Sequence, residues 1–123
     1  MEDRGRTSIL VIDPDAGVRA LIRALLEREG YHTDSAADVE DALELCRAGE
    51  HAAVIVDPRI LGGETLIDAL HRPGDGAKLI VVTTPDSSGL PYRCNPGVHA
   101  VLLKPFLIDE LAAVVESCCD GAG

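Results

Sequence analysis

The chain has 123 residues and a formal net charge of −10, from 21 acidic and 11 basic side chains, so we expect one domain over residues 1–123 with its core at about 7–118. Hydrophobic residues make up 46% and aromatic residues 2%, which argues against disorder and predicts an aliphatic core. The acidic surface disfavours direct nucleic-acid binding, and no apolar run or N-terminal signal suits a membrane or export, so we expect a cytoplasmic protein.

Runs of apolar residues predict buried parallel strands, and one more polar run predicts an edge strand. The expected strands cover residues 8–12, 31–36, 52–56, 78–83 and 98–103.

Apolar residues at helical spacing predict helices between these strands, and Gly30 is expected to end the first. The expected helices cover residues 15–29, 38–48, 64–71 and 107–118, the last with Leu107 facing inward. The segment 84–97 contains three prolines and two glycines, which disfavour a long helix. We therefore expect a loop with at most about one turn of helix, so that any helix between the last two strands is shortened or missing.

Alternating strands and helices predict an α/β domain with a doubly wound five-stranded parallel sheet, a flavodoxin-like fold. The strand order expected for five strands is 2-1-3-4-5, with the topological switch point between strands 1 and 3. Ligands of such sheets bind beyond the carboxyl ends of the strands at this switch point.

Four polar side chains follow the ends of different predicted strands. Asp13 follows the first strand and Asp57 the third, Thr83 ends the fourth, and Lys104 follows the fifth. Carboxylates bind Mg²⁺ or act as nucleophiles toward phosphorus, whereas lysine neutralises phosphoryl oxygens. A single aspartate at a strand end is more often a helix cap, so the hypothesis of one shared pocket depends on the four residues together.

The stretches "ILVIDPD", "AAVIVDPR", "IVVTT" and "LLKPF", with "DEL" downstream, resemble a response-regulator receiver domain of two-component signalling. The resemblance covers almost the whole chain. It implies that Asp57 accepts a phosphoryl group from a histidine kinase or a histidine phosphotransfer protein, while Thr83 and Lys104 contact that group. It also implies a cis peptide bond before Pro105.

The resemblance further implies a Mg²⁺ site made by Asp13, Asp57 and the backbone carbonyl of Arg59. Pro14 stands where the family usually has a second acid, so we expect weak Mg²⁺ binding. Val101 stands where the family usually has a switching aromatic residue. The Arg59 guanidinium can pair with a carboxylate or a phosphoryl oxygen.

Three functions remain open on these residues. The first is an atypical, stand-alone receiver that is not an enzyme and signals by contact with an unknown downstream protein. The second is a degenerate receiver that binds a protein partner without phosphorylation. The third, more remote, is a haloacid-dehalogenase-like phosphatase with Asp13 as nucleophile and Asp15 as general acid; under the receiver hypothesis Asp15 caps the first helix.

Overall fold

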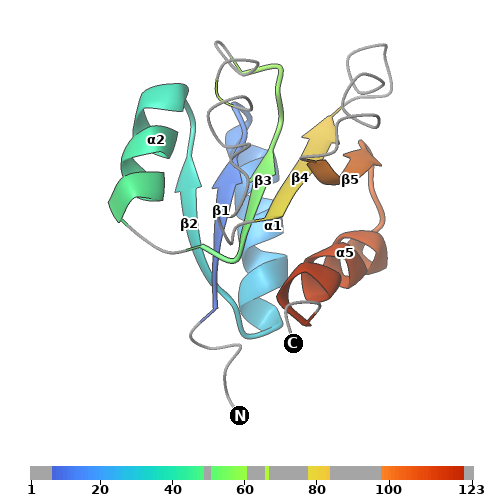
Figure 1. The fold of residues 1–123 in the computed structure, drawn as a ribbon. Coiled ribbons are helices and arrows are strands. Elements are labelled where there is room, and N and C mark those ends of the chain that lie inside the picture. Colours follow the sequence, from blue (N-terminus) through green and yellow to red (C-terminus); the bar gives the residue numbers. More distant parts are fainter. Residues whose placement is uncertain (1–6, 49–50, 61–65, 67–77, 84–97, 121–123) are drawn as a thin grey trace.

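The computed structural model describes residues 7–48, 51–60, 66, 78–83 and 98–120. Strands and helices alternate along the described chain, as the apolar pattern predicts (Figure 1). The elements are β1 (Ser8–Ile12), α1 (Ala16–Arg28), β2 (His32–Ala36), α2 (Val39–Ala48), β3 (Ala53–Val56), β4 (Lys78–Thr83), β5 (Val98–Leu103) and α5 (Ile108–Asp120).

The five strands form one parallel sheet in the order β2-β1-β3-β4-β5, which confirms the predicted fold class and topology. β1 lies between β2 and β3, so the chain reverses its direction of winding there. All strands point the same way, and their carboxyl ends therefore meet along one edge, at the top of Figure 1. This edge is where the predicted site residues were expected to gather.

Each face of the sheet is covered by its own hydrophobic layer, because successive side chains of a strand point to opposite faces. Ile9 and Val11 of β1 belong to the layer that includes α1 and α5. Leu10 and Ile12 belong to the layer that includes α2. Figure 1 shows α1 behind the sheet and α2 at the side of β2. Burial on both faces explains why the central strands are continuously apolar.

The ends of α1 follow from two local residues. Asp15 is the N-cap, and its side chain accepts hydrogen bonds from the backbone N–H groups of Gly17 and Val18. Gly30 has φ of 98°, a left-handed conformation that glycine adopts without a Cβ clash. Both predicted roles, the cap and the stop, are confirmed.

The prediction that Leu107 faces the core is wrong. Its side chain is 71% exposed, whereas Leu111 and Val115 of the same segment are fully buried. Leu107 precedes the first residue of α5, so helical spacing does not determine where its side chain points.

Two predicted features lie outside the described residues. The first is the helix at 64–71, of which only Leu66 is described, as a helical and buried residue. The second is the segment 84–97 with the expected shortening of the fourth helix. Among the described helices, none is both long and apolar enough to cross a membrane.

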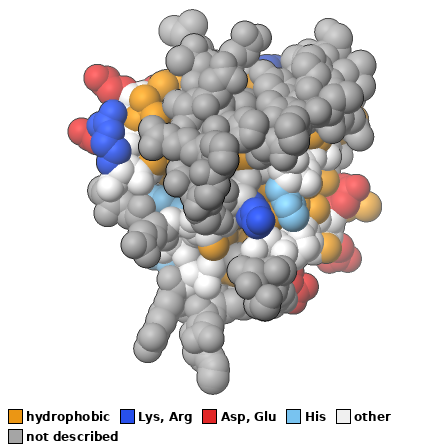
Figure 2. All heavy atoms as spheres, in the orientation of Figure 1, with side chains coloured by type: hydrophobic (Ala, Val, Ile, Leu, Met, Phe, Trp, Pro, Cys, Tyr) orange, Lys and Arg blue, Asp and Glu red, His pale blue; other side chains and the backbone are white. Residues whose placement is uncertain are grey.

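The surface carries the acidic excess of the sequence. Figure 2 shows acidic side chains at two flanks of the molecule, over α2 and over α5. Glu40 and Asp41 stand in the first turn of α2, and Asp109 and Glu110 in the first turn of α5. Negative side chains are favourable there because the helix dipole is positive at its N-terminus.

Candidate functional site

The backbone of the candidate site is held by hydrogen bonds that continue the sheet beyond its strands. The Asp57 N–H donates to the Ile12 carbonyl at 3.0 Å, and the Lys104 N–H donates to the Thr83 carbonyl at 2.7 Å. Asp13 is fixed in the same way by the Ala36 carbonyl at 3.2 Å. The site residues therefore start from the rigid edge of the sheet and not from free loops.

The Lys104 ammonium joins the two carboxylates of the site. Its Nζ lies 2.8 Å from Asp13 Oδ2 and 2.8 Å from Asp57 Oδ2. The Lys104–Pro105 peptide bond is cis, as predicted. One cation thus bridges the ends of β1 and β3 from the end of β5.

Asp57 receives further donors on both oxygens. The Thr83 hydroxyl donates to Oδ1 at 3.2 Å, and the Arg59 N–H donates to Oδ1 at 2.9 Å. The Arg59 guanidinium donates from Nη2 to Oδ2 at 3.1 Å and from Nε to both oxygens at 3.3 Å. The structure therefore brings all five predicted site residues, Asp13 included, into one connected group.

The charged centre of this group is buried. The side chain of Asp57 is 0% exposed and that of Asp13 is 3% exposed, whereas the Lys104 side chain is 14% exposed. Burial, the largest influence on Asp57, favours its neutral form, but hydrogen bonds from Arg59 and Lys104 outweigh burial and lower the pKa. Burial also disfavours charged Lys104, but its contacts with Asp13 and Asp57 raise the pKa of the ammonium. The contacts between Asp57 and Lys104 thus favour the charged form of both groups.

The backbone around Asp13 is held by donors that the sequence analysis did not single out. The Asp15 N–H donates to Asp13 Oδ1 at 2.8 Å, and Arg19 Nη1 donates to the Asp13 carbonyl at 2.6 Å. Pro14 between them is exposed. The position of Arg19 one turn beyond the N-cap is the sequence signal for this contact, because such a side chain can reach back over the start of the helix.

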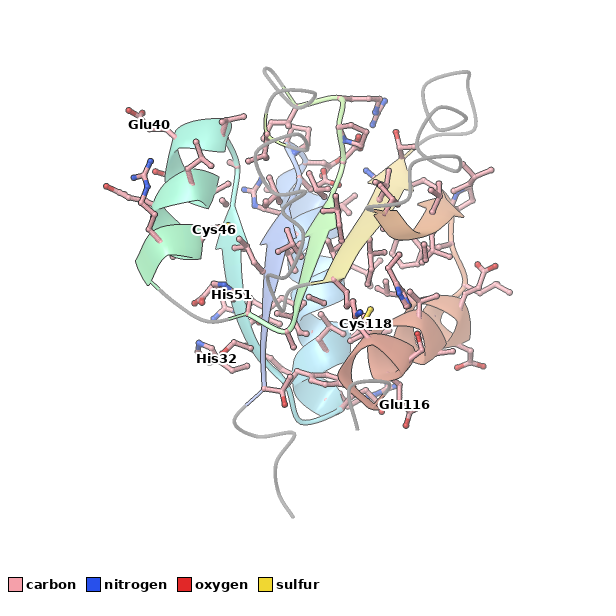
Figure 3. All side chains as sticks on the ribbon, in the orientation of Figure 1. His32, Glu40, Cys46, His51, Glu116 and Cys118 are labelled. Carbon is pink, nitrogen blue, oxygen red and sulfur yellow. The ribbon has the colours of Figure 1, made fainter. Side chains whose placement is uncertain are left out.

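Two of the histidines, His32 and His51, lie away from this site. His51 Nε2 is 3.0 Å from Asp34 Oδ2, and His32 Nε2 is 3.4 Å from Asp34 Oδ1. Figure 3 shows His32 and His51 beside the lower part of β2, whereas the acidic site lies at the upper ends of the strands. These two histidines therefore lie at the other end of the sheet from the site.

The oxygen atoms of the site suit a hard divalent cation, because carboxylate and carbonyl oxygens are typical ligands of Mg²⁺. Within the described part of the chain, however, no group of three or more His, Cys, Asp and Glu side chains is placed to hold a metal ion. The Asp57 oxygens accept from Arg59, Thr83 and Lys104. Asp13 has fewer donors, one on each oxygen. The two carboxylates are therefore suitable ligands for Mg²⁺, but in the structure the Asp57 oxygens accept hydrogen bonds from protein groups.

A doubly wound parallel sheet with an acidic group at its switch point defines a flavodoxin-like α/β protein. The chain belongs to the response regulator receiver domain family, whose model matches residues 9–116. Receiver domains act in two-component signalling, where they interact with histidine kinases or phosphotransfer proteins, and they generally bind Mg²⁺.

Curated relatives include the response regulator MprA of Mycolicibacterium vanbaalenii, 34% identical over 125 residues that cover 94% of this chain and 54% of the relative. MprA of Mycobacterium ulcerans is 35% identical over 109 residues, which cover 85% of this chain and 47% of that relative. The chain thus spans about half the length of these curated relatives.

Solved structures agree with the fold. TrrA from Thermotoga maritima, crystallised in complex with Mg²⁺–BeF, is 29% identical with a TM-score of 0.77, over 91% of this chain and 98% of that one. A sensor protein from Polaromonas sp. JS666 is 27% identical with a TM-score of 0.84, over 96% of this chain and 99% of that one.

Proposed function

We propose that this receiver domain accepts a phosphoryl group on Asp57 from a phosphohistidine of a histidine kinase or phosphotransfer protein. The observation that carries the proposal is the Asp57 carboxylate itself, which is fully buried and contacts both Lys104 and Thr83. A carboxylate held charged by fixed cations is a competent nucleophile toward phosphorus. The domain modifies itself and is not proposed to turn over a substrate.

The transfer step follows from these contacts. One oxygen of Asp57 attacks phosphorus, an O–P bond forms, and the N–P bond of the phosphohistidine breaks. The released imidazole nitrogen takes its proton from solvent. The Lys104 ammonium, 2.8 Å from Asp57 Oδ2, offsets the charge of the phosphoryl oxygens, and the Thr83 hydroxyl donates to one of them.

The output follows from the movement of Thr83. In the structure its hydroxyl donates to Asp57 Oδ1, and a phosphoryl group on Asp57 offers a new acceptor. Phosphorylation therefore favours conformations in which the Thr83 hydroxyl contacts the phosphoryl group. A downstream protein then binds the surface that these conformations present. Val101, half-buried against the α2-side layer, has no ring that would swing with Thr83. The signal is therefore proposed to leave by protein contact.

A divalent cation would be held by Asp13, Asp57 and the Arg59 carbonyl, and when bound Mg²⁺ would supply positive charge to the phosphoryl oxygens. Pro14 contributes no side-chain oxygen, where a carboxylate would add a ligand. We therefore propose weak Mg²⁺ binding by this chain.

The test is incubation with phosphoramidate and Mg²⁺ followed by intact mass measurement. The wild-type protein should gain one phosphoryl group, and Asp57→Asn should gain none. Circular dichroism shows whether both proteins are folded. A folded wild type that gains no mass at any Mg²⁺ concentration contradicts the proposal, and so does equal labelling of Asp57→Asn.

A second candidate is a protein-binding module that works without phosphate. The observation that favours it is that the Asp57 carboxylate already forms ion pairs with both Arg59 and Lys104. In that case Asp57→Asn would leave binding to a purified partner unchanged. The phosphatase hypothesis is not favoured, because the Asp15 carboxylate caps α1 and is engaged by backbone donors.

A further inference from the structure

The Arg59 guanidinium is the most exposed member of the charged network. Its side chain is 44% exposed, whereas that of its partner Asp57 is 0% exposed. Nη2 lies 3.1 Å from Asp57 Oδ2, and Nε lies 3.3 Å from each oxygen. The planar fork of the guanidinium therefore covers the carboxylate from the solvent side.

The formal charges of the four side chains in this arrangement balance one another. Asp13 and Asp57 bring two negative charges, and Lys104 and Arg59 bring two positive charges in direct contact with them. Buried carboxylates are costly unless such cations pair with them. The charge that a divalent ion would bring is thus already present in two side chains of the protein.

We propose that Arg59 is an internal cation that takes over part of the role of the divalent ion and competes with that ion for Asp57. The inference rests on the proposed function, because the charge it supplies is needed when Asp57 is phosphorylated. It assigns the side chain of Arg59, and not only its backbone carbonyl, to the site.

Competition follows from geometry and charge. A Mg²⁺ ion needs lone pairs of the Asp57 oxygens, and the guanidinium already donates to both oxygens. The two cations also repel one another at contact distance. A contact of Arg59 with Asp57 therefore weakens Mg²⁺ binding, and bound Mg²⁺ weakens the contact of Arg59.

The same side chain suits the transfer step. Phosphoryl transfer forms the bond between an Asp57 oxygen and phosphorus and breaks the N–P bond of the donor, and the phosphoryl oxygens carry the negative charge. Guanidinium N–H groups match phosphoryl oxygens as well as they match a carboxylate. The Arg59 side chain is partly exposed, and the proposal places its guanidinium on the incoming phosphoryl oxygens during transfer.

The first measurement uses unphosphorylated protein and Mg²⁺ alone. Isothermal titration calorimetry, or the rise of the melting temperature with Mg²⁺, compares the wild type with Arg59→Ala and Arg59→Lys. We expect Arg59→Ala to bind Mg²⁺ at least about tenfold more tightly, which equals about 1.4 kcal/mol, because the ion no longer competes with the guanidinium for the Asp57 oxygens. Arg59→Lys keeps the charge but not the fork and should fall between the two.

The matched control is Arg23→Ala. Arg23 forms an exposed ion pair with Glu27 on α1, in which the two side chains are 55% and 47% exposed. This variant loses the same charge without touching the site and should bind Mg²⁺ like the wild type. An equal gain in Arg23→Ala would show a general charge effect and overturn the inference, and so would unchanged Mg²⁺ binding in both folded Arg59 variants.

The second measurement separates this inference from the proposed function. Phosphoramidate labelling is followed by intact mass with Mg²⁺ and with a chelator. The wild type should label in both conditions, whereas Arg59→Ala should lose at least about tenfold in rate without Mg²⁺. Equal loss in both proteins overturns the role of Arg59 while Asp57 remains the acceptor. No labelling of any variant defeats the proposed function, and the Mg²⁺ titration still tests the competition.

Discussion

Removing the Lys104 charge is the sharpest test of the network at the end of the sheet. The substitution Lys104→Met keeps most of the aliphatic stem and deletes the ammonium. Asp13 and Asp57, whose side chains are 3% and 0% exposed, then lose the cation that contacts each at 2.8 Å. The variant therefore leaves two buried carboxylates with less compensation.

Breaking a buried ion pair by removing one partner typically lowers the free energy of unfolding by about 3–5 kcal/mol. Arg59 still pairs with Asp57, so we expect the lower end, about 3 kcal/mol of unfolding free energy. For a domain of this size each kcal/mol lowers the melting temperature by about 4 °C. Lys104→Met should therefore melt about 12 °C below the wild type.

The assay is urea unfolding at pH 7 followed by circular dichroism, which yields the free energy of unfolding in water. The control is Lys78→Met, because Lys78 is an exposed lysine at the start of β4 and should change stability by less than about 0.5 kcal/mol. The double variant Lys104→Met/Asp57→Asn should recover about 1 kcal/mol or more, because one of the two buried carboxylates that Lys104 contacted is then neutral. A loss below about 1 kcal/mol in Lys104→Met, or strict additivity in the double variant, would refute the reasoning.

Three further predictions concern acid stability, helix capping and packing. The lowered pKa of Asp57 means that its charged form favours the folded state above its unfolded pKa of about 3.9. That contribution is lost as pH falls through the folded pKa, so unfolding free energies measured from about pH 7 to 2.5 should fall more steeply for the wild type than for Asp57→Asn. Parallel pH curves would contradict this. Asp15→Ala removes the N-cap of α1 and should cost about 1 kcal/mol in urea unfolding while phosphoramidate labelling continues; lost labelling would argue for a chemical role of Asp15. Leu111→Ala should cost about 2–5 kcal/mol because Leu111 is fully buried, and Leu107→Ala less than about 0.5 kcal/mol because Leu107 is 71% exposed; similar costs in thermal unfolding would contradict the observed orientation.

The sequence predicted the strands well because each buried parallel strand must be apolar on both faces. The observed β4 and β5 have the predicted bounds 78–83 and 98–103, and β1 has the bounds 8–12. β2 and β3 begin one residue later than predicted, at His32 and Ala53. The apolar pattern is least informative at the ends of strands, because backbone pairing and not side-chain type decides where a strand begins.

The sequence also indicated which residues share one edge of the sheet. Once the order 2-1-3-4-5 is accepted, residues at the carboxyl ends of β1, β3, β4 and β5 must lie near one another. Asp13, Asp57, Thr83 and Lys104 do so. Their common location could be predicted without side-chain geometry, because strand direction and strand order place all four residues at that edge.

Only the tertiary structure decided which donor meets which oxygen. The sequence allowed Arg59 to pair with a carboxylate or a phosphoryl oxygen, and the structure places its guanidinium on both oxygens of Asp57. It also directs Arg19 to the Asp13 carbonyl and leaves Leu107 in solvent. Such details depend on rotamers and on neighbours distant in the chain, which periodicity does not encode, whereas the alternation of apolar strands and helices is local and is written in the sequence itself.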